Sequence, residues 1–207
     1  MNADSPRPIV LASGSPRRRE LIAALGVTFE VDPADLDETT AEQNPIRVAE
    51  DLALLKARTV ASRRPEALVI GSDTVVALDG RLLGKPADAD EARAMLRSLR
   101  GRAHQVVTGV AVNVDGAERV AHSATAVTMR DYADAEIEAF IATSSPFDKA
   151  GGYASQDPVF APTASIEGCA CGVVGLPLWT LRALLRDAGV EVAEPSLARC
   201  AGCLERR

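Results

Sequence analysis

The chain has 207 residues, of which 47% are hydrophobic and 25% charged; this is ordinary globular usage and excludes a wholly disordered protein. Its 29 acidic and 23 basic residues give a formal net charge of -6, whereas a protein that coats duplex nucleic acid is normally basic. No apolar run approaches the ~20 residues that span a bilayer, and no signal-peptide stretch precedes the first short strand. We therefore expect a cytoplasmic protein that contacts neither membranes nor nucleic-acid polymers.

The first half of the chain predicts alternating strands and helices. Residues 8–12 (PIVLA) form a short apolar run typical of a buried strand. The next residues favour a tight loop and a helix over 17–25, because Ser15 can cap it and Pro16 suits its first position. Further elements are expected as a helix opened by Asn44-Pro45, strands at 67–70 and 75–78, a turn at Asp79-Gly80 and a helix from about 88 to 99.

The second half predicts an antiparallel hairpin followed by helices. Strands are expected at 105–114 and 120–129 around an Asp115-Gly116 turn, then a helix capped by Asp134, a turn-rich stretch at 144–175 and a helix over 178–187. This mixture indicates an α/β fold whose mixed sheet includes antiparallel hairpins, not a purely parallel sheet. We expect one domain over residues 1–192 and a mobile C-terminal tail over 193–207.

All four cysteines lie near the C-terminal end of the chain, at positions 169, 171, 200 and 203. Cys200 and Cys203 form a C-x-x-C pair, and no second pair at zinc-finger spacing accompanies it. A zinc or redox site at this pair stays an alternative. We expect reduced thiols in the tail.

The two histidines, His104 and His122, lie in segments that alternate like strands. A lone histidine in such a place is more often structural than catalytic. A Ser-His-Asp or Cys-His mechanism is therefore not the expectation for this chain.

The segment S-G-S-P-R-R-R (13–19) is a candidate phosphate site. A helix N-terminus offers unpaired backbone N–H groups and the positive end of its dipole to an anion. Ser13 and Ser15 add hydroxyl groups, and Arg17 and Arg18 supply planar forks that match phosphate. The alternative is a capped surface helix with solvated arginines.

The basic residues divide unevenly into 20 arginines and only three lysines. A chain that otherwise uses arginine is expected to keep lysine where a compact ammonium group is needed. Lys56 lies on a predicted helix, Lys85 in a G-K-P turn and Lys149 in D-K-A-G-G. We interpret all three as candidate ligands for phosphate or for a transition state.

Acidic residues supply the complement to these cations. Asp73 directly follows a predicted buried strand, a position where α/β proteins place catalytic groups; the alternative is an aspartate that caps a turn. Asp37 and Glu38 could add a carboxylate for the same metal, or form a solvated loop. Carboxylates beside clustered cations indicate polyphosphate chemistry with Mg²⁺ or Mn²⁺, and no Walker A loop is present.

Seven ordered blocks carry a wider resemblance: L-A-S-G-S-P-R-R-R-E-L (11–21), D-E-T (37–39), G-S-D-T-V-V (71–76), L-G-K-P (83–86), M-L-R-S-L-R-G-R-A-H-Q-V-V-T (95–108), D-K-A-G-G-Y (148–153) and V-V-G-L-P-L (173–178). With these blocks the chain resembles the Maf family of nucleoside triphosphate pyrophosphatases. The resemblance implies a cytoplasmic enzyme that cleaves between the α and β phosphates with a divalent cation. It also implies an elongated, two-lobed α/β fold, similar to that of inosine triphosphate pyrophosphatases, with the nucleotide in a central cleft.

The resemblance also implies roles for individual residues. Asp73 matches the proton acceptor that activates water, and Lys85 is expected to act with it in catalysis. The metal would be held by Glu38 and Asp73. Phosphate contacts are implied for Ser13, Ser15, Arg18, Lys56 and Lys85, and dTTP/UTP-type specificity for Arg17, Thr74 and Gln156.

The chain departs from the dTTP/UTP-type pattern around the expected base pocket, at Ala154, Ser155, Asp157 and over 166–172. The second hypothesis is therefore the same chemistry on a modified or purine nucleotide. A third, of another class, is a regulator of cell division that acts through protein contacts, for which the tail could supply a surface. Assembly as a homodimer stays open.

Overall fold

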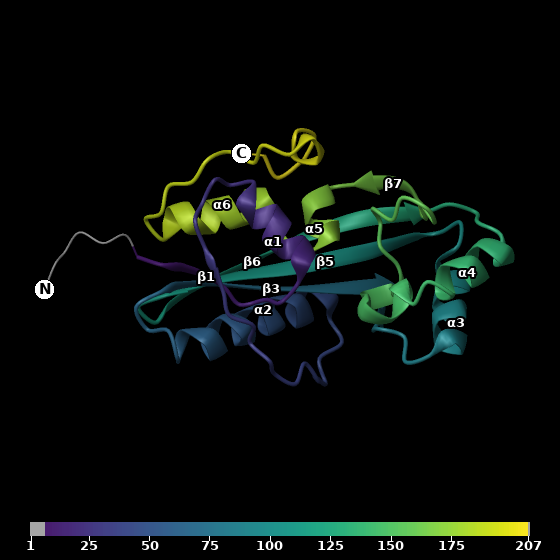
Figure 1. Cartoon of the computed structure of the whole chain (residues 1–207), viewed down its shortest axis with the longest axis horizontal. Helices are drawn as coiled ribbons and strands as arrows, with labels where there is room; N and C mark the ends of the chain where they lie inside the picture. The colour runs from purple at the N-terminus through teal and green to yellow at the C-terminus, as the bar shows by residue number, and fades with distance from the viewer. Residues whose placement is uncertain (1–6, 207) are drawn as a thin grey trace, which may run out of the picture.

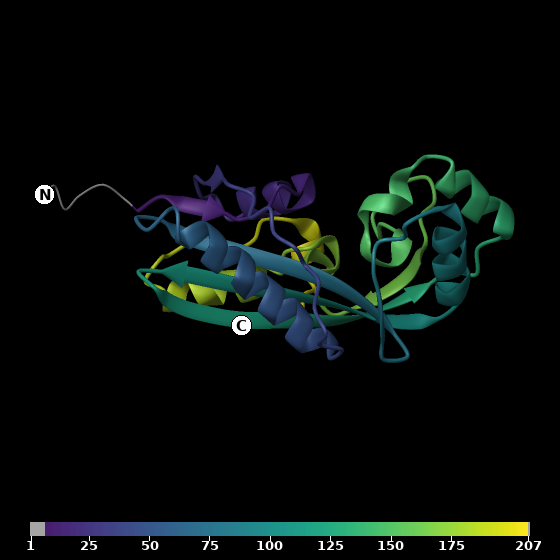
Figure 2. The same ribbon diagram turned by 90° about the horizontal axis from the view of Figure 1, so that it is seen from below.

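The computed structural model describes residues 7–206, so residues 1–6 of the predicted domain and residue 207 of the predicted tail lie outside the described residues. The molecule is elongated, with one twisted sheet along most of its length (Figure 1). Helices cover both faces of the sheet, and a smaller lobe lies at one end (Figure 2). This matches the α/β class and the elongated shape that the sequence predicted.

The sheet mixes parallel and antiparallel pairs in the order β2-β1-β3-β5-β6-β7, with β4 paired to β3. The strand bounds are β1 (Ile9–Leu11), β2 (Glu30–Val31), β3 (Leu68–Leu78), β4 (Arg81–Leu83), β5 (Ala103–Val114), β6 (Ala117–Met129) and β7 (Thr163–Glu167). Strand β1 is parallel to β2 and β3, and the other pairs are antiparallel. The long antiparallel ladder of β3, β5 and β6 forms the backbone of the molecule.

The described residues form the α-helices α1 (Pro16–Ala23), α2 (Pro45–Ala61), α3 (Ala89–Leu99), α4 (Asp134–Ile141), α5 (Ala170–Val174) and α6 (Leu178–Asp187). Short 3-10 turns are η1 (Ser145–Asp148), η2 (Ala150–Gly152) and η3 (Ala198–Cys200). Helix α2 lies on one face of the sheet, and α1, α5 and α6 lie on the other (Figure 1). Helices α3 and α4 with η1 and η2 build the small lobe (Figure 2).

Most predicted elements are confirmed because their local signals are strong. Ser15 caps α1 by accepting from the Arg18 backbone N–H, and Pro16 is its first residue. Both Asp-Gly dipeptides form hairpin turns in which each residue has positive φ, as a type I′ turn requires. Helix α6 has the predicted bounds.

Three expectations about elements are corrected. Strand β3 is continuous from Leu68 to Leu78, so Asp73 lies inside a strand and not after one. The N-cap of α4 is Ala133, and Asp134 is its first helical residue. The turn-rich stretch at 144–175 contains β7 and α5 besides its turns. Pairing with β5, in which Asp73 faces Gly109, outweighs the turn-like composition around Gly71-Ser72.

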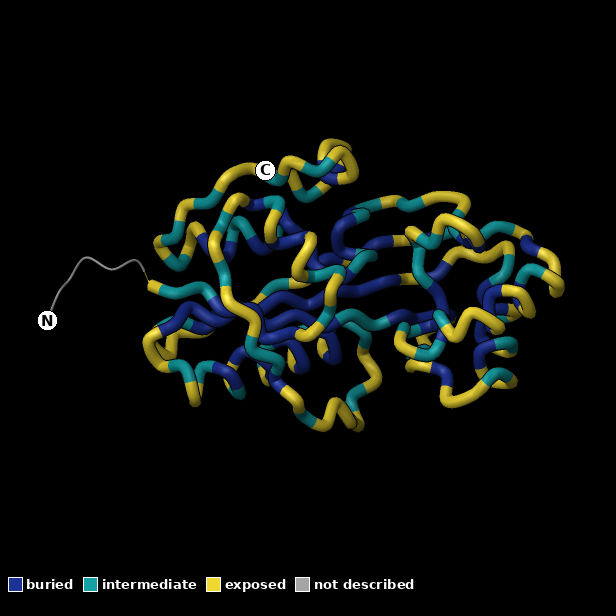
Figure 3. The backbone as a smooth tube through the Cα atoms, viewed as in Figure 1, coloured by how far each residue is buried: buried dark blue, intermediate teal, exposed yellow. Residues whose placement is uncertain are grey.

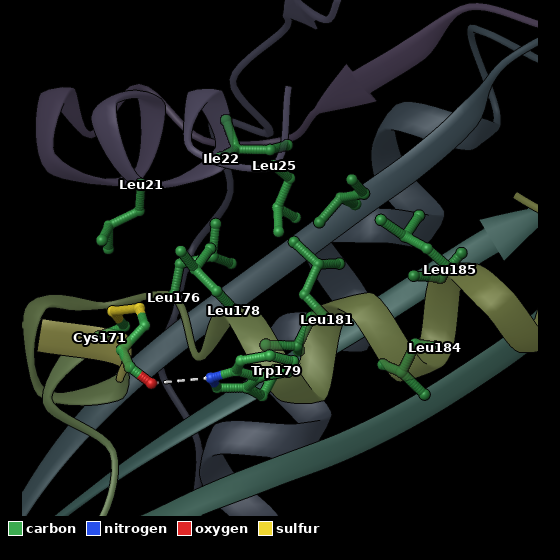
Figure 4. Close-up of a cluster of buried hydrophobic side chains, with 14 of the residues drawn as sticks. Leu21, Ile22, Leu25, Cys171, Leu176, Leu178, Trp179, Leu181, Leu184 and Leu185 are labelled. Carbon is green, nitrogen blue, oxygen red and sulfur yellow. Dashed lines mark hydrogen bonds between the residues drawn. A yellow bond between two sulfur atoms is a disulfide. The ribbon is translucent and has the colours of Figure 1, made fainter. Parts of the chain in front are cut away.

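The core follows this division into layers. One cluster joins α1, α5 and α6 to the sheet and includes Ile22, Cys171 and Leu181 (Figure 4). A second lies in the small lobe around Leu96 and Tyr132. The third lies under α2, and the buried segments follow the central strands (Figure 3).

Helix α2 touches the sheet at two glycines. A Cβ atom on Gly71 would lie 2.1 Å from the Ala53 carbonyl oxygen, and one on Gly109 would lie 2.1 Å from that of Ala49. Such distances exclude any side chain at either position. The backbone of α2 therefore rests directly on β3 and β5.

The tail expected to be mobile is packed against α6 in its described part. Cys200 and Cys203 are buried, and Trp179 Nε1 donates to the Cys200 carbonyl at 3.0 Å. Thr180 Oγ1 donates to Glu205 Oε2 at 2.5 Å. The described part of the tail therefore covers apolar surface of α6 and supplies these hydrogen-bond partners, while its mobility stays a prediction.

Among the helices formed by residues 7–206, none combines the length and the apolar composition needed to cross a membrane.

Candidate active site

A cavity of about 410 Å³ opens between the body and the small lobe. Its walls come from the β1–α1 loop, the 33–38 segment, α2, β3, the turn after β4, the η1–η2 region and the end of α5 with its C-cap Gly175. All ten site residues predicted from the sequence line it: Ser13, Ser15, Arg17, Arg18, Glu38, Lys56, Asp73, Thr74, Lys85 and Gln156. Lys149 also lines this cavity, so it contains all three lysines.

The β1–α1 loop presents hydroxyl groups and a fixed guanidinium to this cavity. Ser13 Oγ accepts from the Ser15 backbone N–H at 3.3 Å and from Arg18 Nη1 at 3.1 Å. Arg18 Nε donates to the Gly175 carbonyl at 2.8 Å, and Nη2 donates to Thr74 Oγ1 at 3.3 Å. Three partners from three segments hold the guanidinium in one orientation, which suits it to bind an anion.

Lys56 lies between two carboxylates at the bottom of the cavity. Its Nζ donates to Asp73 Oδ1 at 2.5 Å and contacts Glu38 Oε1 at 2.7 Å. The Lys56 and Asp73 residues are 7% and 6% exposed, whereas the Glu38 side chain is 44% exposed. The Lys56 ammonium therefore has two carboxylate partners. Through these ion pairs it connects the segment that carries Glu38 to strand β3, which carries Asp73.

Burial and neighbouring charges shift the pKa values of Glu38 and Arg18 in opposite directions. Burial raises the pKa of Glu38, but the hydrogen bond and charge of Lys56, with the charges of Lys85 and Arg18, leave it lowered from its usual value. Burial lowers the pKa of Arg18, and the carboxylates of Asp73 and Glu38 oppose that change. Glu38 is therefore held in its charged form by the cations of the cavity.

The other two lysines differ in their surroundings. Lys149 Nζ donates to the Ser145 carbonyl at 2.5 Å and to Ser145 Oγ at 3.2 Å, and it also pairs with Asp148. These contacts join Lys149 to the first and last residues of η1, so Lys149 stabilises that turn. Lys85 is an exposed residue whose charge acts on Glu38. Of the two, Lys85 is better placed to meet a ligand.

The wall expected to choose the base is made mainly by loops. Arg17 Nη1 lies 3.7 Å from Asp148 Oδ2, and Ser155 Oγ donates to Gln156 Oε1 at 3.2 Å. Thr74, expected to affect specificity, shares a 2.9 Å hydrogen bond with Thr108 besides its contact with Arg18. Thr74 therefore also helps to position the Arg18 guanidinium.

The departures from the family pattern lie mostly outside this wall. Ala154 and Ser155 line the cavity, but Asp157 and residues 166–172 do not. Asp157 Oδ1 instead accepts from the backbone N–H groups of Val159 and Phe160 at 3.0 and 2.8 Å. The additional acid thus stabilises a turn.

Sequence reasoning missed two groups that shape the cavity. The Gly175 carbonyl accepts from Arg18 and also from Ser72 Oγ at 3.0 Å, and a backbone oxygen has no side-chain pattern that could reveal it. Tyr153 lines the cavity, and its hydroxyl shares a 2.5 Å hydrogen bond with His104 Nε2. Burial lowers the pKa of His104 to about 4, so the imidazole is neutral near pH 7, in agreement with the expected structural role.

Comparison with known proteins places this geometry in a family. The pattern of the family described as Maf-like protein matches residues 8–188. A dTTP/UTP pyrophosphatase of Thermomicrobium roseum is 53% identical over 189 residues, which cover 90% of this chain and 87% of that one. Proteins of the same name from Pelotomaculum thermopropionicum and Deinococcus radiodurans are 48% and 45% identical, with 90% and 92% of this chain and 99% and 97% of theirs covered. The chain belongs to the Maf family.

Proposed function

We propose that this chain is a nucleoside triphosphate pyrophosphatase that hydrolyses dTTP and UTP to the monophosphate and pyrophosphate. The observation that carries the proposal is the single cavity that brings Arg18, Lys56 and Lys85 together with Asp73 and Glu38. A triphosphate needs such a local group of cations, although the chain as a whole is acidic. The names of the relatives support the choice of pyrimidine nucleotides.

The contacts of Asp73 support its role as the base. Its Oδ1 accepts from Lys56, which fixes the carboxylate and directs Oδ2 to take a proton from water. The water oxygen then attacks the α phosphorus, the bond to the bridging oxygen breaks, and pyrophosphate leaves. Arg18 and Lys85 stabilise the negative charge that develops on the phosphate oxygens.

We extend the proposal to Mg²⁺ or Mn²⁺ held by Glu38 and Asp73. The donor set fits such an ion, because Glu38 and Asp73 both line the cavity and each uses one oxygen for Lys56, which leaves a second carboxylate oxygen on each residue as a candidate ligand. Carboxylate oxygens together with substrate phosphates are the usual ligands of Mg²⁺. When bound, the cation would neutralise phosphate charge.

The test is product analysis with the purified full chain. With dTTP or UTP and Mg²⁺ or Mn²⁺, we expect pyrophosphate and the monophosphate, and loss of turnover when a chelator removes the cation. Release of orthophosphate would overturn the proposed reaction. A panel of canonical and modified triphosphates tests the substrate, since preference for a purine or modified base would leave the chemistry intact and reject dTTP and UTP.

A further inference from the structure

All four cysteines of the chain meet at one place, away from the lining of the active-site cavity. Cys169 and Cys171 lie at the start of α5, and Cys200 and Cys203 lie at η3 and the turn after it. They are 1%, 1%, 1% and 6% exposed, and all belong to the core cluster that joins α1 and α6 (Figure 4).

Two close sulfur contacts join the same two segments. The Sγ atoms of Cys171 and Cys200 are bonded to each other, with Cα atoms 6.5 Å apart. Cys169 and Cys203 are free and buried, and their sulfur atoms lie within 4.8 Å of each other and of a carboxylate oxygen of Glu205. The sulfur atoms of both segments therefore line one small junction.

We propose that Cys169, Cys171, Cys200 and Cys203 bind one zinc ion as four thiolates. Cys200 and Cys203 have the C-x-x-C spacing of many structural zinc sites, and Cys169 and Cys171, one residue closer in sequence, would supply the other two ligands from a second segment. Zn–S bonds of about 2.3 Å in a tetrahedron place the sulfur atoms about 3.8 Å apart. The sulfur atoms of Cys169 and Cys203 already lie within 4.8 Å of each other, and those of Cys171 and Cys200 are in bonding contact.

The state that binds zinc has four reduced cysteines, so Cys171 and Cys200 are ligands in it and not a disulfide. Each thiol releases its proton as it binds, and no electrons are transferred. The disulfide alone would use two of the four sulfur atoms and leave two polar thiols buried beside Glu205. The backbone N–H of Gly172 already donates to Cys169 Sγ at 3.2 Å, the kind of contact that orients a ligand sulfur.

Zinc in this place would fasten the tail to the wall of the active site. Helix α5 ends at Val174, and the next carbonyl, that of Gly175, holds Arg18 and Ser72. The metal would thus join residues 200–203 to the turn that orients the phosphate-side arginine. Glu205 is left out of the ligand set, because Thr180 already holds its carboxylate.

The first experiment measures zinc and thiols in the full chain, purified with a reductant that does not bind metals. We expect about one zinc ion per chain and four thiols after denaturation. In protein purified without reductant, two thiols and no zinc would identify the Cys171–Cys200 disulfide and overturn the proposal. Four thiols without zinc would overturn it as well.

Variants then assign the ligands. Cys203→Ser and Cys169→Ser are expected to reduce bound zinc to background, and Glu205→Gln is the matched control that keeps it. Loss of zinc in Glu205→Gln with retention in both serine variants would reject a four-thiolate site.

If the serine variants do not fold, Co²⁺ added to the reduced, metal-free natural chain gives the answer. Thiolate-to-cobalt charge-transfer bands with the absorption of tetrahedral cobalt are expected, and their absence overturns the proposal.

Discussion

The two ends of the active-site cavity are built in different ways. At the charged end, Lys56 and Asp73 stand on a helix and a long central strand, and both are almost fully buried. The loop end, residues 153–156, carries Gln156 as an exposed residue without a helix or strand to hold it. A proton-accepting carboxylate and its ammonium partner need fixed geometry. A wall that distinguishes nucleobases can change in sequence without moving these two catalytic groups.

The forces that hold the two ends also differ. Ion pairs from Lys56 to Asp73 and Glu38 join the charged end. The loop end is anchored below Tyr153 by its hydrogen bond to the neutral, buried His104. Lowering the pH, or substituting a single residue, should therefore change the properties of one end of the cavity without changing those of the other.

The largest effect is expected at the charged end. Asp73→Asn keeps the shape of the side chain but removes the base, so kcat for dTTP should fall about 1000-fold. Asp115→Asn, in an exposed hairpin turn far along the sheet, is the matched control and should retain full turnover. Activity of Asp73→Asn within about tenfold of the natural chain would reject Asp73 as the base.

Acid should destabilise the loop end through His104. Its folded-state pKa of about 4 lies below the unfolded value of 6.5, so the unfolded chain binds more protons between these values. The contribution of the neutral His104 to the free energy of unfolding is therefore fully present above about pH 6.5. It is lost as the pH falls toward 4, by up to about 3 kcal/mol. Urea unfolding from about pH 7 to about pH 4.5 measures this loss.

The variant His104→Gln should flatten that pH dependence. An unchanged slope in His104→Gln would show that other groups cause the loss.

A smaller effect is expected where the two ends meet, at Lys85. Lys85→Arg keeps the charge but replaces a compact ammonium with a planar fork, and kcat/KM should fall about 10- to 100-fold. Arg81→Lys, an exposed exchange in β4, is the control. Natural turnover in Lys85→Arg would mean that the scarcity of lysine does not mark this position.

The smallest effect is expected at the loop end. Gln156→Ala should change the ratio of kcat/KM between UTP and a purine triphosphate by about tenfold while kcat for the better substrate stays close to natural. Asp157→Asn should keep both this ratio and kcat, because Asp157 accepts hydrogen bonds from backbone groups outside the cavity. A collapse of kcat in Gln156→Ala would show that the loop end takes part in chemistry.

Local signals made much of the fold and the cavity predictable. Ser15 and Pro16 mark the start of α1, and the motifs shared with the Maf family indicated ten of the residues that line the cavity. The continuity of β3 could not be predicted in this way, because Gly71 and Ser72 are typical of turns and only the ladder with β5 makes them a strand. Long-range pairing overrides local preference there.

The meeting of the cysteines escaped prediction for a similar reason. Cys171 and Cys200 are 29 residues apart in sequence, and each pair taken alone is an ordinary short motif. Only the return of the tail across α6 brings them together. The packing of the tail on α6 could not be predicted, because burial by a partner segment leaves no trace in the tail's own composition.

The glycines under α2 determine which substitutions near this helix the protein can tolerate. Because the helix backbone rests on Gly71 and Gly109, the height of α2 above the sheet is set by main-chain atoms and not by the size of core side chains. Lys56 reaches Asp73 from that fixed height. Substitutions among the apolar residues nearby can therefore accumulate without altering the reach of the ammonium, whereas a single methyl group at either glycine would lift the helix and separate the pair.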